Sequence, residues 1–108
     1  MSPRRGEIWW VNLDPTRGSE IKKTRPCVVV GNNILNERRR SVVIIPLSTG
    51  PEAAPPLLVP VACGGKRSTA VVDQIRAVAK ERLDRRMGEL SPGDLIRLED
   101  ALRTVLEL

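Results

Sequence analysis

Hydrophobic and polar residues alternate along most of the chain in short runs that are typical of β-strands. Residues 7–13 alternate loosely between two faces, and residues 27–30 and 41–47 are apolar, largely β-branched runs that indicate buried strands. Pro26 fits the start of a strand, where its missing N–H matters least. The other segments that we expect to form strands are 57–61, 69–72 and 74–78, the last two as either one strand or two.

Polar segments rich in glycine and proline separate these predicted strands. Residues 14–19 have the composition of a turn, and the pair at 64–65 predicts a tight one. Residues 51–56 hold three prolines and no periodicity, so we expect an exposed, mobile loop there. Residues 32–40 are polar and end in three arginines, which is consistent with a loop or a short helix.

The C-terminal part of the chain changes to a helical pattern. Ser91 is a favourable N-cap, Pro92 fits the first helical position, and Asp94 lies near the positive end of the helix dipole. Aliphatic residues then recur at helical spacing on one face: Leu95, Leu98, Leu102, Val105 and Leu106. Residues 80–89 should hold a helical turn. The sequence therefore predicts a mainly β fold, a small barrel of five to seven strands closed by one C-terminal amphipathic helix.

The amino-acid composition restricts which residue types can form the core and which cellular compartment we expect. The 108 residues are enough for one domain, and with no Phe or Tyr its core must consist of Val, Leu and Ile. Cys27 and Cys63 are expected as free thiols in a reducing compartment, with Cys27 in the core. No apolar run approaches the ~20 residues of a membrane-spanning helix, so we expect a cytoplasmic protein without a membrane partner.

The net charge of +5 is unevenly distributed. Residues 1–80 carry 13 Lys and Arg against 6 Asp and Glu, or +7, whereas residues 81–108 carry 5 against 7, or −2. A basic body of this kind favours a polyanionic partner such as nucleic acid.

The segment over residues 5–30 is the most informative in the chain. It begins RGEIWWVNLDPTRGSE and ends TRPCVVV, which reads as strand, polar loop and strand. This segment resembles the opening of the MazF/PemK family of toxin endoribonucleases, and the resemblance continues over residues 42–49 and 72–78. It implies a single MazF/PemK-like toxin domain over residues 1–108, with an SH3-like barrel of the PemK type.

The resemblance also implies an activity. The family cuts single-stranded RNA at specific sequences without a metal or cofactor, and so acts as a toxin that arrests growth by blocking translation. The 2′-hydroxyl of the RNA attacks the adjacent phosphorus, which leaves 2′,3′-cyclic phosphate and 5′-hydroxyl ends. Because this chain has no histidine, the reaction would have to use other side chains.

Arg25 matches the catalytic arginine of the family, which precedes a proline and a hydrophobic run. A guanidinium is planar, always charged and able to bind two phosphate oxygens, so it suits the stabilisation of a charged transition state. Its high pKa, about 12.5–13.8, makes it a poor resting base. We therefore assign Arg25 mainly to transition-state stabilisation.

A hydroxyl residue is the second catalytic group that the resemblance implies. The family has a threonine after its next core strand, but in the register set by Pro46 and Leu47 this chain has Ser48. Ser48 is our first candidate and Thr49 the second. The alternative is that both are ordinary turn residues. Glu20, from the loop that covers the site in similar proteins, is a candidate to accept a proton or orient Arg25, or else forms a loop salt bridge.

The predicted RNA contacts come from two segments. The sequence DQIR resembles a family motif, in which Gln74 has an amide able to read a base edge, while Asp73 and Arg76 either contact RNA or pair with each other. The candidates from the first loop are Arg17, Ser19, Lys22 and Lys23. Two further cationic runs that we expect on loops beside the site are 38–40 and 66–67. Of the adjacent Trp9 and Trp10, one should lie in the core and the other should support a dimer or binding surface, because neighbouring strand residues point to opposite faces.

Other functions compete with this one. Glu20, Ile21 and Lys22 fit the E-x-K tripeptide of restriction-type metal nucleases, but such tripeptides arise easily by chance. Two distant cysteines and no histidine make a zinc site improbable. The main rival is a non-catalytic binder on the same barrel, either an RNA-binding module or a toxin like the related family that poisons DNA gyrase.

The resemblance finally implies protein partners. The family forms homodimers and is silenced by an antitoxin with an acidic, partly disordered tail, which the basic body of this chain would attract. The end strands and the C-terminal helix are candidates for the dimer contact.

Overall fold

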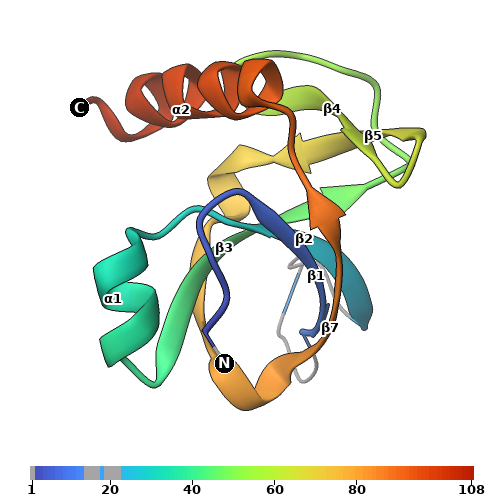
Figure 1. Ribbon diagram of the computed structural model, residues 1–108. Coiled ribbons are helices and arrows are strands. Elements are labelled where there is room, and N and C mark those ends of the chain that lie inside the picture. The colour runs from blue at the N-terminus through green and yellow to red at the C-terminus, as the bar shows by residue number, and fades with distance from the viewer. Residues whose placement is uncertain (1, 14–17, 19–22) are drawn as a thin grey trace.

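The computed structural model describes residues 2–13, 18 and 23–108 (Figure 1). These residues form seven strands, two α-helices and two single-turn 3₁₀ helices. The strands are β1 (Glu7–Asn12), β2 (Thr24–Val29), β3 (Ser41–Ser48), β4 (Leu58–Cys63), β5 (Lys66–Val71), β6 (Arg76–Ala79) and β7 (Leu83–Glu89). The helices are α1 (Asn33–Arg38), η1 (Val72–Gln74), η2 (Lys80–Arg82) and α2 (Pro92–Leu106). The predicted mainly β barrel with a C-terminal helix is confirmed.

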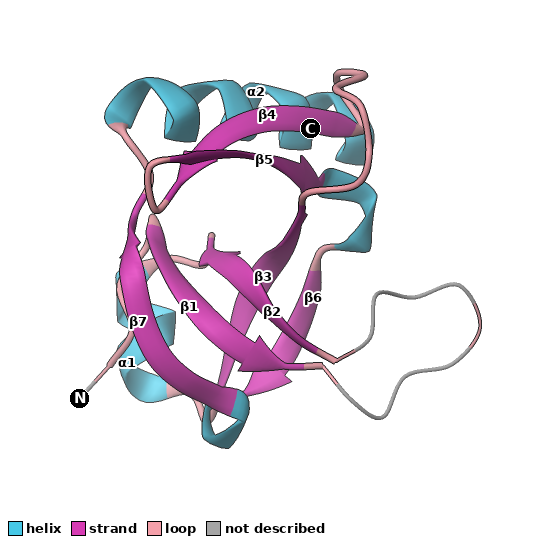
Figure 2. Ribbon diagram, turned by 90° about the vertical axis from the view of Figure 1, so that its right-hand side faces the viewer, coloured by secondary structure: helices cyan, strands magenta, loops and turns pink. Residues whose placement is uncertain are grey.

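Strand β3 connects the two halves of the fold. The sheet order is β4-β5-β3-β2-β1-β7, and β6 also pairs with β3. Residues 41–44 of β3 pair with β6, whereas Leu47 and Ser48 pair with β5. Figure 2 shows the result, in which β1, β2, β3, β6 and β7 curl around one space while β4 and β5 form a second layer beneath α2.

Strand alternation produces two aliphatic cores, because successive side chains point to opposite faces. The inner core, inside the curl, consists of Trp9, Val11, Leu13, Cys27, Val29, Val42, Ile44 and Val78, with Leu83 packed against them. The outer core lies between the curled sheet, the second layer and α2, and includes Ile8, Val28, Ile45, Leu47, Val59, Val61, Ala70 and Leu98. The predicted aliphatic core is confirmed. Cys27 and Cys63 are both buried free thiols, as expected.

Helix α2 is held at its start by two polar contacts. The Ser91 hydroxyl accepts a 3.1 Å hydrogen bond from the backbone N–H of Asp94, as the sequence predicts for an N-cap. The buried Asp94 carboxylate in turn accepts a 2.9 Å bond from the N–H of Ala62 on β4. Leu98 is buried on the inner face of the helix, whereas Leu106 is 46% exposed, so its assignment to that face was wrong. Leu106 is the last helical residue, where the chain turns away through the left-handed cap.

Strand β7 is the element that the sequence pattern misses. The helical turn expected over residues 80–89 is limited to η2, and the following residues pair with β1 instead. Four of the seven β7 residues are charged, and the β1–β7 register shifts twice. Because bulges break the strict alternation, β7 has no period of two that a sequence can reveal.

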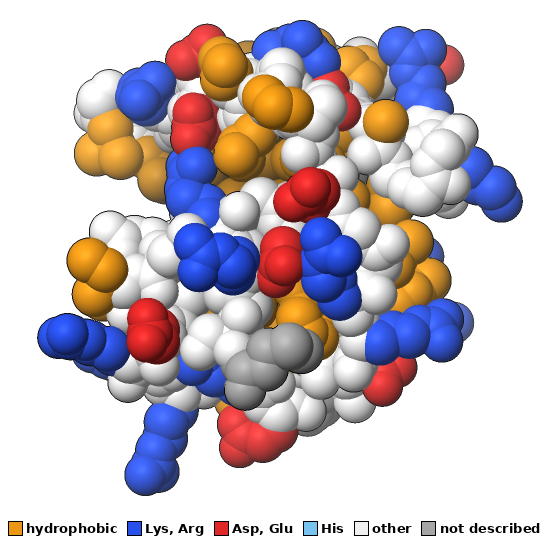
Figure 3. Space-filling view, viewed as in Figure 1, with side chains coloured by type: hydrophobic (Ala, Val, Ile, Leu, Met, Phe, Trp, Pro, Cys, Tyr) orange, Lys and Arg blue, Asp and Glu red, His pale blue; other side chains and the backbone are white. Residues whose placement is uncertain are grey.

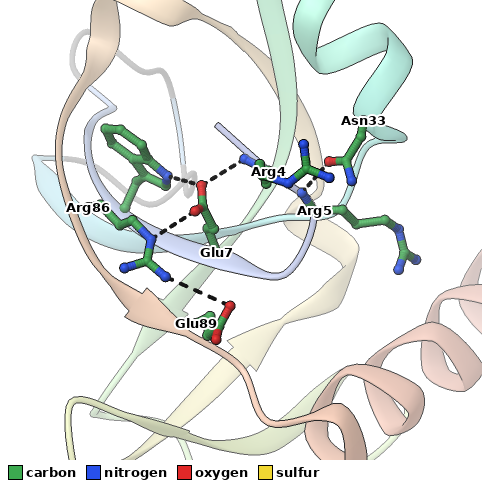
Figure 4. A network of polar contacts seen from close by, with 7 residues as sticks. Arg4, Arg5, Glu7, Asn33, Arg86 and Glu89 are labelled. Atoms are coloured by element: carbon green, nitrogen blue, oxygen red, sulfur yellow. Dashed lines mark hydrogen bonds and ion pairs between the residues drawn. The ribbon is translucent and has the colours of Figure 1, made fainter. Parts of the chain in front are cut away.

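Glu7 joins the chain terminus to the β1–β7 pair (Figure 4). Its carboxylate accepts hydrogen bonds from the backbone N–H of Arg4 at 2.7 Å, from Trp9 Nε1 at 3.1 Å and from Arg86 Nε at 2.8 Å. The Nη2 of Arg86 also lies 3.8 Å from the Oε2 of Glu89. Burial raises the pKa of Glu7, but these hydrogen bonds and the Arg86 charge outweigh it, so the pKa is lowered overall.

Candidate active site

The site lies where β2 and β3 separate. Their last paired residues are Cys27 and Pro46, and beyond that pair β3 turns to β5. Arg25 lies two residues before Cys27, and Ser48 lies two residues after Pro46. Since residues two apart share a face of a strand, both belong to the face of the inner core. We call this end of the inner core, where β2 and β3 separate, the mouth.

Arg76 brings a second guanidinium to the face of the inner core. It is paired with Ile44 of the inner core, and Ile44 pairs on its other side with Val29 of β2. Burial raises the pKa of the Cys27 thiol to about 12, and the positive charge of Arg76 opposes that rise. Arg76 therefore lies on the same face as Cys27 and Arg25. Arg25 is exposed and Arg76 half-buried.

Two buried hydroxyls fix the end of β3. Ser68 donates a 3.2 Å hydrogen bond to the Ser48 carbonyl, and Thr69 donates a 3.1 Å bond to the Pro51 carbonyl. Ser48 is the last residue of the strand, whereas Thr49 is exposed in the bend that follows. Within the described part of the chain, neither the Ser48 hydroxyl nor the Arg25 guanidinium has a side-chain partner. Both groups are therefore available to a ligand.

The DQIR segment forms η1, which links β5 to β6, and the start of β6. Asp73 is exposed and Gln74 half-buried. Asp73 and Arg76 form no ion pair in the structure as described, so the alternative of a structural pair is not realised. Lys23 is exposed just before β2, with a left-handed φ of 67°. The remaining candidates, Arg17, Ser19, Glu20 and Lys22, lie outside the described residues.

The other sequence candidates lie elsewhere. Trp9 is buried in the inner core, while Trp10 is half-buried on the other face of β1 with the Arg85 guanidinium 5.7 Å from its ring centre. The expectation of one core tryptophan is confirmed, and the role of Trp10 at a dimer or binding surface stays a prediction. The run 66–67 starts β5 after the tight turn predicted at 64–65, where both glycines have positive φ values. The run 38–40 lies at the Ser41 end of β3, away from Ser48, so its expected place beside the site was wrong.

Sequence reasoning missed the supporting residues of the mouth. Ser68 and Thr69 are each only 6% exposed. The sequence predicts a strand that begins at Thr69, but it gives neither hydroxyl a role. Only the pairing of β5 with the end of β3 gives them a role.

Among the described residues, no group of three or more His, Cys, Asp or Glu side chains is placed to hold a metal. None of the described helices is long and apolar enough to cross a membrane.

Comparison with known proteins assigns the family. Residues 4–106 match the family described as the PemK-like, MazF-like toxin of type II toxin–antitoxin systems. The chain belongs to this family. A relative, endoribonuclease MazF9 of Mycobacterium tuberculosis, is 38% identical, and the alignment covers 97% of each chain. Endoribonuclease MazF of Staphylococcus epidermidis is 30% identical over 97% of this chain and 92% of its own.

Solved structures agree with this family. A mycobacterial endoribonuclease in complex with its cognate antitoxin matches with a TM-score of 0.84 and 25% identity, over 99% of this chain and 97% of that one. MazF from Deinococcus radiodurans has the same fold, with a TM-score of 0.89 at 21% identity, over 100% of this chain and 99% of that one. The predicted resemblance to the PemK/MazF toxins is thus confirmed over nearly the whole chain.

Proposed function

We propose that this chain is a toxin endoribonuclease that cuts specific sequences in single-stranded RNA without a metal and so arrests growth by blocking translation. The 2′-hydroxyl of the RNA attacks the adjacent phosphorus, the 5′-oxygen leaves, and the products carry 2′,3′-cyclic phosphate and 5′-hydroxyl ends. The observation that carries the proposal is the mouth, where Arg25 and Ser48 flank the last β2–β3 pair with their functional groups free of side-chain partners in the described structure. The names of the curated relatives support it.

The two groups have different roles. The Arg25 guanidinium binds the phosphoryl oxygens and stabilises the charge that grows on them in the transition state. The Ser48 hydroxyl hydrogen-bonds either a phosphoryl oxygen or the attacking 2′-oxygen. Arg76, half-buried on the same face as Cys27, adds a second positive charge there. Glu20 is our candidate to accept the proton of the 2′-hydroxyl, and Thr49 is the alternative hydroxyl.

The remaining site residues bind the RNA. Gln74 reads a base edge, with Asp73 and Arg76 of the same segment contacting the RNA beside it. Arg17, Ser19, Lys22 and Lys23 contact the backbone and bases from the loop between β1 and β2. The finer features of the proposal follow the family: residues 1–108 form a single domain, act in the cytoplasm and form a homodimer. A cognate antitoxin with an acidic tail binds the basic body of the chain, as the antitoxin-bound neighbour supports.

A chelated cleavage assay tests the proposal. The purified protein is incubated with a fluorescent single-stranded RNA pool in EDTA, and both ends of every product are mapped. We expect discrete cuts with cyclic-phosphate ends, and Arg25→Ala should lose nearly all cleavage while melting at the same temperature. Arg103→Ala, on the exposed side of α2 beside Asp100, is the matched arginine control and should cut normally. Binding without cleavage would favour the non-catalytic rival, and cleavage that EDTA abolishes would favour a metal nuclease.

A further inference from the structure

Two cations to which the proposed function gives no role lie at the β4–β5 hairpin. Lys66 and Arg67 begin β5 directly after the tight turn, and both are exposed. Within the described residues neither side chain forms an ion pair, whereas four other arginines do. Figure 3 shows Lys or Arg side chains that project from the side of the molecule where this hairpin ends. Both charges are therefore available to an anion.

These two cations line a cavity of about 450 Å³ between the hairpin and the first turn of α2, which we call the hairpin pocket. Figure 2 shows the end of the hairpin close to the start of that helix. Two more charged residues, Asp94 and Arg97, line the pocket. The rest of the lining comes from residues 60–62 and Gly65, and none of these is an exposed large apolar residue.

The hairpin pocket is positive because its one carboxylate is already neutralised. Asp94 accepts the N–H of Ala62 at 2.9 Å and pairs with Arg97, whose side chain is 61% exposed. The charges of Lys66 and Arg67 remain uncompensated. The start of the 15-residue α2 adds the positive end of a helix dipole. A guanidinium and an ammonium group with no apolar anchor beside them suit a phosphate, which is compact and fully charged.

The hairpin pocket shares a face of the sheet with the mouth. Ser48 is the partner of Thr69 on β5, and Arg67 lies two residues before Thr69. Opposite residues and residues two apart point to the same face, so all three side chains do. In this diagonal arrangement the Cα atoms of Ser48 and Arg67 are about 7–8 Å apart. Since β3 lies between β2 and β5, Ser48 stands between Arg25 on one side and Arg67 on the other.

The bend after β3 separates the mouth from the hairpin pocket. Thr69 is 6% exposed and donates a 3.1 Å hydrogen bond to the Pro51 carbonyl, so the backbone of the bend covers it. A ligand that reaches from Ser48 to Arg67 therefore passes over this bend. A single small anion cannot occupy both places, whereas a flexible strand with a phosphate at every nucleotide can.

We propose that the hairpin pocket binds a backbone phosphate of the same RNA strand whose scissile phosphate lies at the mouth. Arg67 contacts two oxygens of this flanking phosphate, and Lys66 and Arg97 add positive charge around it. The inference rests on the proposed ribonuclease function and extends its substrate site. Because a phosphate contact carries no sequence information, the pocket strengthens binding whatever the flanking base is.

Binding of an RNA that cannot be cut tests the inference. The probe is a fluorescein-labelled 14-nucleotide single strand with fluorine in place of every 2′-hydroxyl, and anisotropy measures its affinity. Lys66→Ala with Arg67→Ala should weaken binding about tenfold, the scale of one charged hydrogen-bonded contact. The slope of log K against log salt should become shallower by about 0.7, as for the loss of one phosphate contact. Arg39→Ala with Arg40→Ala removes the same charge from exposed positions at the other end of β3 and should change neither quantity.

Cleavage of two matched substrates tests the position of the contact. For a 14-nucleotide RNA centred on a mapped cut, the hairpin double variant should raise KM about tenfold with kcat unchanged, because a contact remote from the reacting atoms binds substrate and transition state equally. A 5-nucleotide RNA around the same cut lacks the flanking phosphate, so the double variant should cut it like the parent. Replacing single flanking phosphates by uncharged methylphosphonates should weaken the parent at one position and leave the double variant unaffected there.

Each possible result decides the inference, provided that melting temperatures show both double variants to be folded. Equal affinities and salt slopes in the hairpin and control variants would overturn it while leaving the ribonuclease proposal intact. An equal loss on the 5-nucleotide RNA would overturn it too, and so would a poly-Glu peptide that binds more tightly than RNA and loses that affinity in the hairpin variant. A parent that shows the expected binding but cuts no RNA would refute the ribonuclease proposal and keep the phosphate contact.

Discussion

The hydroxyl of Ser68 donates a 3.2 Å hydrogen bond to the backbone carbonyl of Ser48. This bond joins β5 to the last residue of β3, at the point where β3 has left β2. Ser68 is 6% exposed, so no solvent replaces the bond. The position of the Ser48 side chain relative to Arg25 therefore depends on a residue that faces away from the mouth.

Removing this bond should slow catalysis through Ser48. We expect Ser68→Ala to lower kcat about tenfold with little change in KM, and to lower the free energy of unfolding by about 1 kcal/mol, because a buried carbonyl loses its donor. Ser68→Thr keeps the hydroxyl and should restore most of kcat. Ser91→Ala removes a helix cap at a similar loss of stability, about 1 kcal/mol, and should not change kcat. Equal kcat losses in Ser68→Ala and Ser91→Ala would show that general stability, not position, is responsible.

The choice between the two neighbouring hydroxyls is testable. Ser48 is within the strand and on the Arg25 face, whereas Thr49 is exposed in the bend. We expect Ser48→Ala to lose most cleavage, Ser48→Thr to retain it, since a threonine hydroxyl reaches the same place with a stiffer χ1, and Thr49→Ala to stay within about twofold of the parent. Single-turnover rates on one fluorescent RNA measure all three. The reverse order, with Thr49→Ala inactive, would move the catalytic hydroxyl to the bend.

Arg25 should act through the planar, two-point donor geometry of its guanidinium as well as through its positive charge. In Arg25→Lys the positive charge remains but the planar, two-point contact with phosphate is lost. We expect cleavage to fall about 100-fold, on the scale of removing one transition-state hydrogen-bond donor, while RNA binding weakens only slightly. Rates at saturating RNA, with anisotropy on a non-cleavable RNA, separate the two effects. Arg103→Lys controls for loss of a guanidinium elsewhere on the surface.

Strong local patterns made much of this molecule predictable. The strands β1 to β3 have apolar runs that end in turn residues, and α2 has both a cap and a helical period. The motif around Arg25 and the register of Pro46 also put Arg25 near the start of β2 and Ser48 at the end of β3, where the structure has them.

Features that arise from tertiary contacts were not predictable. Strand β7 forms through its pairing with β1, and the register of that pairing shifts twice. Its charged sequence therefore has no alternation of hydrophobic and polar residues that would predict a strand. Ser68 has a role only because β5 returns to the end of β3. The arginine run 38–40 was expected beside the site, but strand pairing puts the site at the other end of β3, next to Ser48.

Glu7 should make the fold sensitive to acid. Its side chain is 15% exposed, and its lowered pKa means that the folded state favours the carboxylate more than the unfolded state does. The stabilisation is thus present above the ordinary glutamate pKa of about 4.3 and is lost as the pH falls through the lower folded value. Melting temperatures from pH 6 to pH 3 should fall less steeply in Glu7→Gln than in the parent. Glu52→Gln, at an exposed glutamate in the loop before β4, should leave the parent's slope unchanged.

Asp94 should contribute more to the stability of the fold than an exposed carboxylate on the same helix. Its carboxylate is 7% exposed, accepts the Ala62 N–H at 2.9 Å and pairs with Arg97 at the start of α2. In Asp94→Ala the Ala62 N–H loses its partner, so we expect the free energy of unfolding to fall by about 1–3 kcal/mol. Asp94→Asn keeps an acceptor oxygen and should lose less, while Asp100→Ala, whose carboxylate pairs only at the surface with Arg103, should lose well under about 1 kcal/mol. Urea unfolding of the three variants gives these differences directly. A loss in Asp94→Ala no greater than in Asp100→Ala would mean that the bond to β4 does not hold α2 in place.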